Sequence, residues 1–151
     1  METFESVDAL LDFAIEKEAE ANEFYRDLAG KMEREAMKKV FQEFAAEEAK
    51  HKQKLIAVKE GKQLMSAEQK VMDLKIGDYL VDVPASPDMD YQDALIVAMK
   101  KEKASFRLYN DLAATTDDGN LQTLLLGLAQ EEAKHKLRLE IEYDEYILTE
   151  Q

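Results

Sequence analysis

Two segments of this chain repeat each other at one fixed spacing, and this repeat constrains the fold more than any other feature of the sequence. The segment AEEAKHKQKL at 46–55 returns as QEEAKHKLRL at 130–139, an offset of 84 residues. Glu18 returns as Glu102 at the same offset. Because separate blocks that share one offset are improbable by chance, we infer that a helical hairpin has been duplicated.

Each half of the chain contains two helical patterns whose apolar residues recur at steps of four and three. These stripes span 7–28 and 37–58 in the first half, and 91–112 and 121–139 in the second. Such a stripe faces a neighbouring helix in a bundle. With only 5 Gly and 2 Pro, the chain has little turn chemistry for many short strands. We therefore predict an all-α four-helix bundle built from two antiparallel hairpins.

The expected helix ends define the connections. Gly61 is placed to end the second helix, and 117–120 (Asp-Asp-Gly-Asn) offers a turn and an N-cap for the fourth. The segment 61–88 carries both prolines and a candidate capping box at 66–69, and it is too long for a tight turn. We predict one long crossover there, and a single domain over 1–151.

Charge and composition exclude several classes of function. The 33 acidic residues outnumber the 20 basic ones and give a net charge of −13, which repels nucleic-acid phosphates and anionic lipids. The absence of cysteine excludes disulfides, zinc-thiolate sites and thiol catalysis within this sequence. No apolar run is long enough to cross a bilayer, and the first residues do not read as a signal peptide. We expect a cytoplasmic protein without nucleic-acid or membrane partners.

Six ionisable side chains interrupt the apolar stripes at matching heights. They are one Glu on the first and third patterns and one Glu-x-x-His on the second and fourth: Glu18, Glu48, His51, Glu102, Glu132 and His135. The midpoint between the Glu and the Glu-x-x-His pair falls near residue 34 in the first half and near residue 118 in the second. Both midpoints lie between helical patterns, so each hairpin should bring its Glu opposite its Glu-x-x-His.

This arrangement predicts a site for two metal ions. Glu and His three residues apart point the same way from a helix and can bind one ion. Burying four carboxylates without a counter-charge would cost several kcal/mol per ion, whereas two divalent cations cancel their charge. A single stripe Glu is usually a surface residue, and a single Glu-x-x-His is weak evidence. However, the only two histidines of the chain occupy equivalent positions in both halves, each three residues after a stripe Glu. This joint pattern favours metal binding.

Two tyrosines on the stripes have two equally weighted interpretations. Tyr25 and Tyr109 each lie one heptad beyond a stripe Glu. Their hydroxyls could orient a ligand carboxylate from a neighbouring helix. Alternatively, they are core aromatics whose hydroxyls lie at the bundle edge.

With these motifs, the sequence resembles the rubrerythrin group of the ferritin-like superfamily, over about residues 8–60 and 90–145. The resemblance rests on Glu18 with Tyr25, Glu48-Ala49-Lys50-His51, Glu102 with Tyr109, and Glu132-Ala133-Lys134-His135. It implies a ferritin-like fold, a homodimer, and two iron ions per chain, with manganese or zinc as alternatives. It also implies that Glu48 and Glu132 bridge the two ions and that the other four residues are terminal ligands.

Two departures from the family pattern qualify what the resemblance implies. Rubrerythrins proper have a rubredoxin domain with four cysteines that feeds electrons to the site, and this sequence has no cysteine. Any electron donor would then be a separate protein. They also have a further Glu one turn before the third-helix ligand, where Met99 stands here. A symmetric six-ligand site instead resembles those of ferritin-like ferroxidases and oxidases.

The expected function is that of a di-iron carboxylate oxidoreductase. Bound Fe(II) would react with hydrogen peroxide or dioxygen, in iron handling or oxidative-stress defence. The first alternative is a non-catalytic metal-binding or iron-storage protein of the same fold. The second is a structural bundle that merely tolerates polar residues in its core.

Overall fold

The computed structural model describes residues 2–81, 86 and 88–150, and this part of the chain is helical without a named strand. Its α-helices are α1 (Val7–Lys31), α2 (Glu35–Glu60), α3 (Glu68–Met72), α4 (Tyr91–Thr115) and α5 (Gly119–Glu150). The chain divides into two compact units, one of residues 4–74 and one of residues 1–3 with 75–151. Each unit holds one of the predicted hairpins. Among the described helices, none combines the length and apolar character that a bilayer crossing requires.

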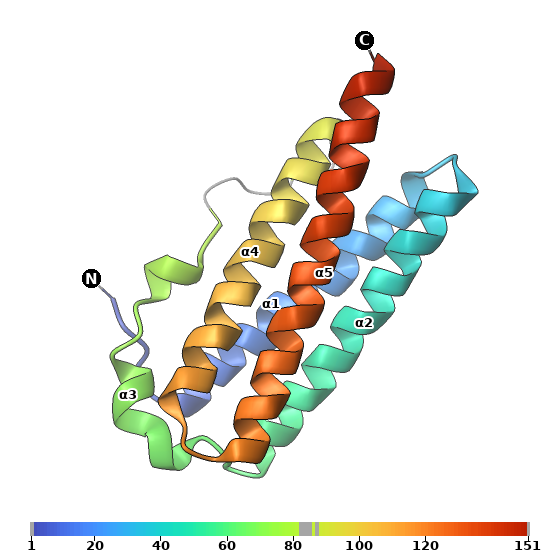
Figure 1. The fold of residues 1–151 in the computed structure, drawn as a ribbon. Helices are drawn as coiled ribbons and strands as arrows, with labels where there is room; N and C mark the ends of the chain where they lie inside the picture. Colours follow the sequence, from blue (N-terminus) through green and yellow to red (C-terminus); the bar gives the residue numbers. More distant parts are fainter. Residues whose placement is uncertain (1, 82–85, 87, 151) are drawn as a thin grey trace. The chain divides into compact units, whose positions relative to one another are not determined.

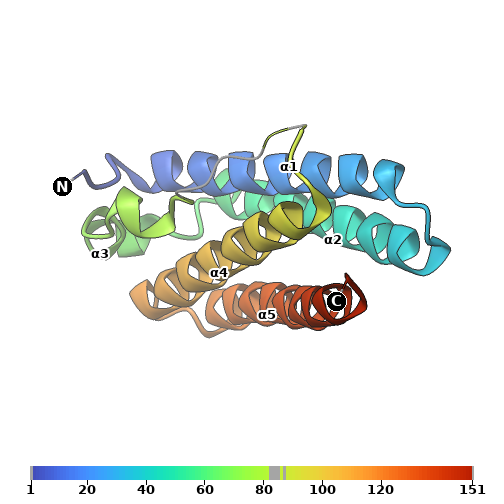
Figure 2. The same cartoon turned by 90° about the horizontal axis from the view of Figure 1, so that it is seen from above.

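The first unit is an antiparallel hairpin of α1 and α2, which run side by side in both ribbon views (Figures 1 and 2). Ser6 caps α1 by accepting a hydrogen bond from the amide of Ala9 at 3.0 Å. The helices are joined at 32–34, and α2 ends at Gly61 as predicted. Every residue of the two predicted stripes is buried, which confirms the helical period. Away from the turn, Lys59 Nζ donates to Asp12 Oδ1 at 2.6 Å and links the two helices on the surface.

The second unit contains the antiparallel hairpin of α4 and α5 (Figure 1). Asp90 caps α4 through the amide of Asp93 at 2.8 Å. The Asp118 carboxylate accepts from the amide of Leu121 at 3.1 Å at the start of α5. The predicted turn and N-cap at 117–120 are therefore confirmed.

The connection between the hairpins contains two 3₁₀ turns, η1 (Met65–Ala67) and η2 (Ile76–Tyr79), and the short helix α3. The capping box predicted at 66–69 is wrong. Ser66 lies inside η1, which runs directly into α3, so Ala67 occupies the N-cap position and supplies no side-chain hydrogen bond. Pro84 and Pro87 lie outside the described residues. The single-domain assignment of 1–151 stays a prediction.

Polar contacts between side chains connect η2 to α4. The buried Tyr79 hydroxyl donates to Asp111 Oδ2 at 2.7 Å, and Arg107 lies 3.4 Å from the Asp78 carboxylate. Burial, reinforced by the hydrogen bond to Asp111, raises the pKa of Tyr79 above its usual value. Just before η2, Lys75 forms an isolated antiparallel bridge with Thr3. The start of the chain is thus joined to the segment that leads into the second hairpin.

Replacing Tyr79 by phenylalanine is expected to lower the free energy of unfolding by about 1 kcal/mol at neutral pH, because Asp111 loses a donor but remains partly hydrated. The raised pKa means that the folded state holds the phenol proton more tightly than the unfolded state. The contribution of the Tyr79 hydroxyl to the free energy of unfolding is therefore full below about pH 10 and falls as the pH rises further. Urea denaturation of both proteins at pH 7 and above pH 10 checks this. A difference that grows with rising pH would contradict it.

Candidate metal centre

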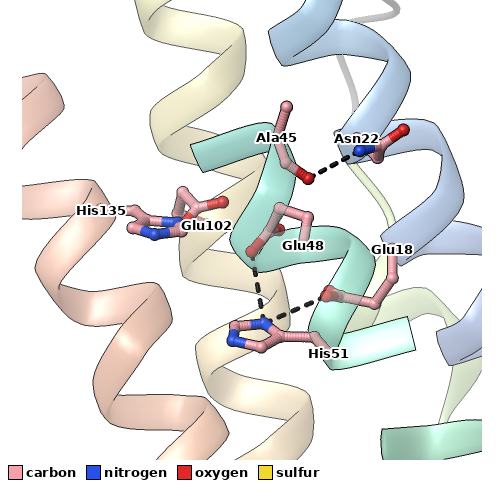
Figure 3. A network of polar contacts seen from close by, with 7 residues as sticks. All are labelled: Glu18, Asn22, Ala45, Glu48, His51, Glu102 and His135. Carbon is pink, nitrogen blue, oxygen red and sulfur yellow. Dashed lines mark hydrogen bonds and ion pairs between the residues drawn. The ribbon is translucent and has the colours of Figure 1, made fainter. Parts of the chain in front are cut away.

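The first hairpin brings its predicted ligands together. Glu18 from α1 and Glu48 from α2 both point toward the imidazole of His51 (Figure 3). His51 Nδ1 lies 3.1 Å from Glu18 Oε2 and 3.3 Å from Glu48 Oε1. One ligand atom of each residue lies within 4.8 Å of the others, and none of the three side chains is more than 1% exposed. We call these three residues the first triad.

The second hairpin repeats this arrangement with Glu102 from α4 and Glu132 and His135 from α5. His135 Nδ1 lies 3.1 Å from Glu102 Oε2. One ligand atom of each residue again lies within 4.8 Å of the others, and exposure does not exceed 3%. We call these residues the second triad. The juxtaposition of Glu and Glu-x-x-His within each hairpin, expected from the equal distances to the turn, is thus present in both.

The donor set of each triad fits a divalent transition-metal ion. Two carboxylates and one neutral imidazole carry a formal charge of −2, which one divalent cation neutralises. Like charges within a few ångströms in a water-poor interior are unfavourable unless a positive charge lies among them. Carboxylate oxygens with an imidazole nitrogen suit iron, manganese or zinc, and the chain offers no thiolate that would favour a softer site. The residues present therefore fit the metal that the sequence predicts.

The two stripe tyrosines are both buried, at 1% exposure. The ring of Tyr25 stacks on Phe41 with 6.1 Å between ring centroids and meets Phe44 edge-on at 5.3 Å. These contacts fit the interpretation of Tyr25 as a core aromatic. A role for Tyr25 or Tyr109 in orienting a ligand carboxylate stays a prediction.

A buried carboxylate of the second hairpin, which pairs with a half-buried tyrosine, was missed from the sequence. Glu142 is 1% exposed and accepts a hydrogen bond from the Tyr91 hydroxyl at 2.8 Å. A signal was available, because the stripe of α5 continues from Leu139 to Glu142 by one more step of three. At the offset of 84, the first hairpin has the buried pair Val7 and Val58 instead. The duplicated halves thus share the Glu and Glu-x-x-His pattern of the candidate site but differ in the core beyond it.

Comparisons with known proteins identify the fold and the family of this chain. A crystal structure from Thermotoga maritima, provisionally described as a ferritin-like diiron-carboxylate protein, matches with a TM-score of 0.79 and 22% identity. The match covers 97% of this chain and 99% of the other, and it confirms the predicted ferritin-like helical-bundle fold. The rubrerythrin family model matches residues 9–143, so the chain belongs to the rubrerythrin family. No curated protein matches the chain at a significant level.

Proposed function

We propose that this protein is a di-iron oxidoreductase of the rubrerythrin family that reacts Fe(II) with hydrogen peroxide or dioxygen in iron handling or oxidative-stress defence. The observation that carries the proposal is the buried Glu, Glu and His triad, which occurs once in each duplicated hairpin. Two triads supply six ligands and four negative charges, enough for two divalent ions per chain. Membership of a diiron family supports the choice of iron.

The side chains of the triads would hold the ions and adjust their chemistry. When bound, two Fe(II) ions supply the two electrons that, with two protons, reduce one hydrogen peroxide to two water molecules. The carboxylates of Glu18, Glu48, Glu102 and Glu132 stabilise a more highly charged ion more strongly than a less charged one, which favours oxidation. The burial of the ligands limits the access of water, so these charges act at low screening.

The partners that we propose follow from the same chemistry. The small-molecule partner is the oxidant. The sequence contains no cysteine to ligate an additional iron centre, so we assign the reduction of the oxidised site to a separate electron-donor protein. We also propose that the chain acts as a homodimer, as the family resemblance implies, and that it does so in the cytoplasm.

An anaerobic titration of the metal-free protein with Fe(II) tests the proposal. We expect two equivalents to bind per chain, followed by oxidation faster than that of free Fe(II) when peroxide or dioxygen is added in separate experiments. The near-ultraviolet absorption of oxidised iron reports the rate. Protein loaded beforehand with Zn(II), which fills the same ligands but carries no redox electrons, is the control and should show no such absorption.

Each outcome has a distinct meaning. Fast oxidation by one of the two oxidants supports the enzyme and identifies its substrate. Two bound equivalents without acceleration would reject the enzyme in favour of a non-catalytic metal-binding or storage protein. Failure to bind Fe(II) would reject the metal site itself and leave a structural bundle.

A further inference from the structure

A side-chain hydrogen bond ties α1 to α2 beside the first triad. Asn22 Nδ2 donates to the backbone carbonyl of Ala45 at 2.6 Å (Figure 3). The Asn22 side chain is half-buried and Ala45 is buried. Ala45 lies within α2, where its carbonyl has a second lone pair besides the one that an α-helix uses. The bond can therefore form without opening the helix.

This hydrogen bond between Asn22 and Ala45, which we call the tie, lies close to the proposed metal ligands along both helices. Asn22 follows Glu18 by four residues, one turn along the same face of α1, and Ala45 precedes Glu48 by three residues on α2. These separations correspond to about 6 Å and about 4.5 Å along the helix axes. The tie therefore fixes the axial position of one ligand-bearing helix against the other next to the point where their ligands meet.

The second hairpin cannot form the same tie. At the offset of 84, Asn22 corresponds to Phe106 and Ala45 to Ala129. A phenylalanine side chain has no hydrogen-bond donor. The two triads therefore have the same residue types in the same spacing. However, the hydrogen bond that joins the two helices beside the first triad has no counterpart at the equivalent position of the second hairpin.

We propose that Asn22 is a positioning residue for the first triad and that, as a result, the first triad binds a divalent metal ion more tightly than the second. Ligands that come from two helices bind an ion well only when their separation is held to within about 0.5 Å of the required geometry. The tie reduces the freedom of α1 to slide along α2. Binding of the ion therefore costs less conformational entropy. The inference rests on the proposed function, because it requires that the triads bind metal.

The test is an anaerobic titration of the full metal-free chain with Co(II), followed by its visible d–d absorption. We expect two steps in the wild-type protein, and we expect His51→Gln to remove the tighter one. Asn22→Leu keeps the approximate side-chain size but removes the donor. It should weaken the tighter step about tenfold, as is usual for loss of a group that supports metal ligands, and leave the other step unchanged within about twofold.

A matched control separates positioning from general loosening of the hairpin. Lys59→Met removes another α1 to α2 side-chain link, the 2.6 Å bond to Asp12, which lies farther from the triad along both helices than Asn22 does. It should leave both Co(II) steps unchanged within about twofold. An equal loss of affinity in Lys59→Met and Asn22→Leu would overturn the inference. Thermal melts of the metal-free variants report whether each is folded.

The remaining outcomes also decide the question. A wild-type chain that binds no Co(II) would overturn the proposed function and this inference together. Normal wild-type binding with an unchanged Asn22→Leu titration would overturn the inference alone. If Asn22→Leu does not fold, Phe106→Asn supplies an independent test, since a donor at the equivalent position should tighten the weaker step about threefold. An unchanged weaker step in that variant would overturn the inference.

Discussion

The substitution Glu48→Ala is expected to weaken the binding of Fe(II) by at least about a hundredfold, more than is typical for loss of a group that merely supports a ligand. Glu48 belongs to the first triad, lies 3.3 Å from His51 Nδ1, and is fully buried. Its removal takes away a ligand atom and one of the two charges that attract the ion. Anaerobic titration with Fe(II) measures the loss, and oxidation by peroxide should fall in parallel.

The stability of the metal-free protein distinguishes a ligand role from a structural one. Glu48→Gln, which keeps the shape of the side chain and removes its charge, should lose metal affinity but be at least as stable as the wild type without metal, because a buried charge beside Glu18 has been removed. The control is Glu43→Ala, which also removes one negative charge but lies on the exposed face of α2. It should change neither the free energy of metal binding nor the free energy of unfolding by more than about 0.5 kcal/mol. Unchanged metal binding in Glu48→Ala would favour the structural bundle.

Truncation of Phe41 to alanine is expected to lower the free energy of unfolding by about 3–5 kcal/mol. Phe41 is fully buried, stacks on Tyr25, and meets Phe44 edge-on at 6.3 Å between ring centroids. The substitution removes apolar area and leaves a cavity that the neighbouring rings can fill only in part. Urea denaturation of the metal-free protein, followed by circular dichroism, measures the effect.

The duplicated half provides the matched control for Phe41. The equivalent position holds Leu125, which is also fully buried. Phe41→Leu therefore introduces the residue that the second hairpin uses and should cost only about 1–2 kcal/mol, since most of the volume remains and the aromatic contacts are lost. If Phe41→Leu were as destabilising as Phe41→Ala, aromatic geometry rather than volume would dominate at this site.

The helices and the proximity of the residues within each triad could be predicted because their signals are periodic and repeated. Steps of four and three predict which face of each helix is buried. Equal distances from the turn predict that Glu18 meets His51, and Glu102 meets His135, and both pairs lie at 3.1 Å. Gly61 and Asp118 ended and began helices as expected because capping depends on local backbone geometry.

Contacts that depend on tertiary packing could not be predicted in the same way. The bond from Asn22 to the carbonyl of Ala45 involves a backbone group, which no residue pattern marks. The contact of Tyr79 with Asp111 depends on how the irregular connection folds onto α4. The predicted capping box failed for a related reason, because the preceding 3₁₀ turn determines where α3 starts.

The pairing of the first residues has a practical consequence for how the protein should be produced. Thr3 bridges Lys75, and the amide of Ile76 donates to the carbonyl of Glu2 at 3.1 Å. A purification tag fused directly before residue 2 would therefore lie next to the segment that leads into α4, although the tag would precede α1 in the sequence. An affinity label inserted at the turn of 32–34 would leave that pairing intact.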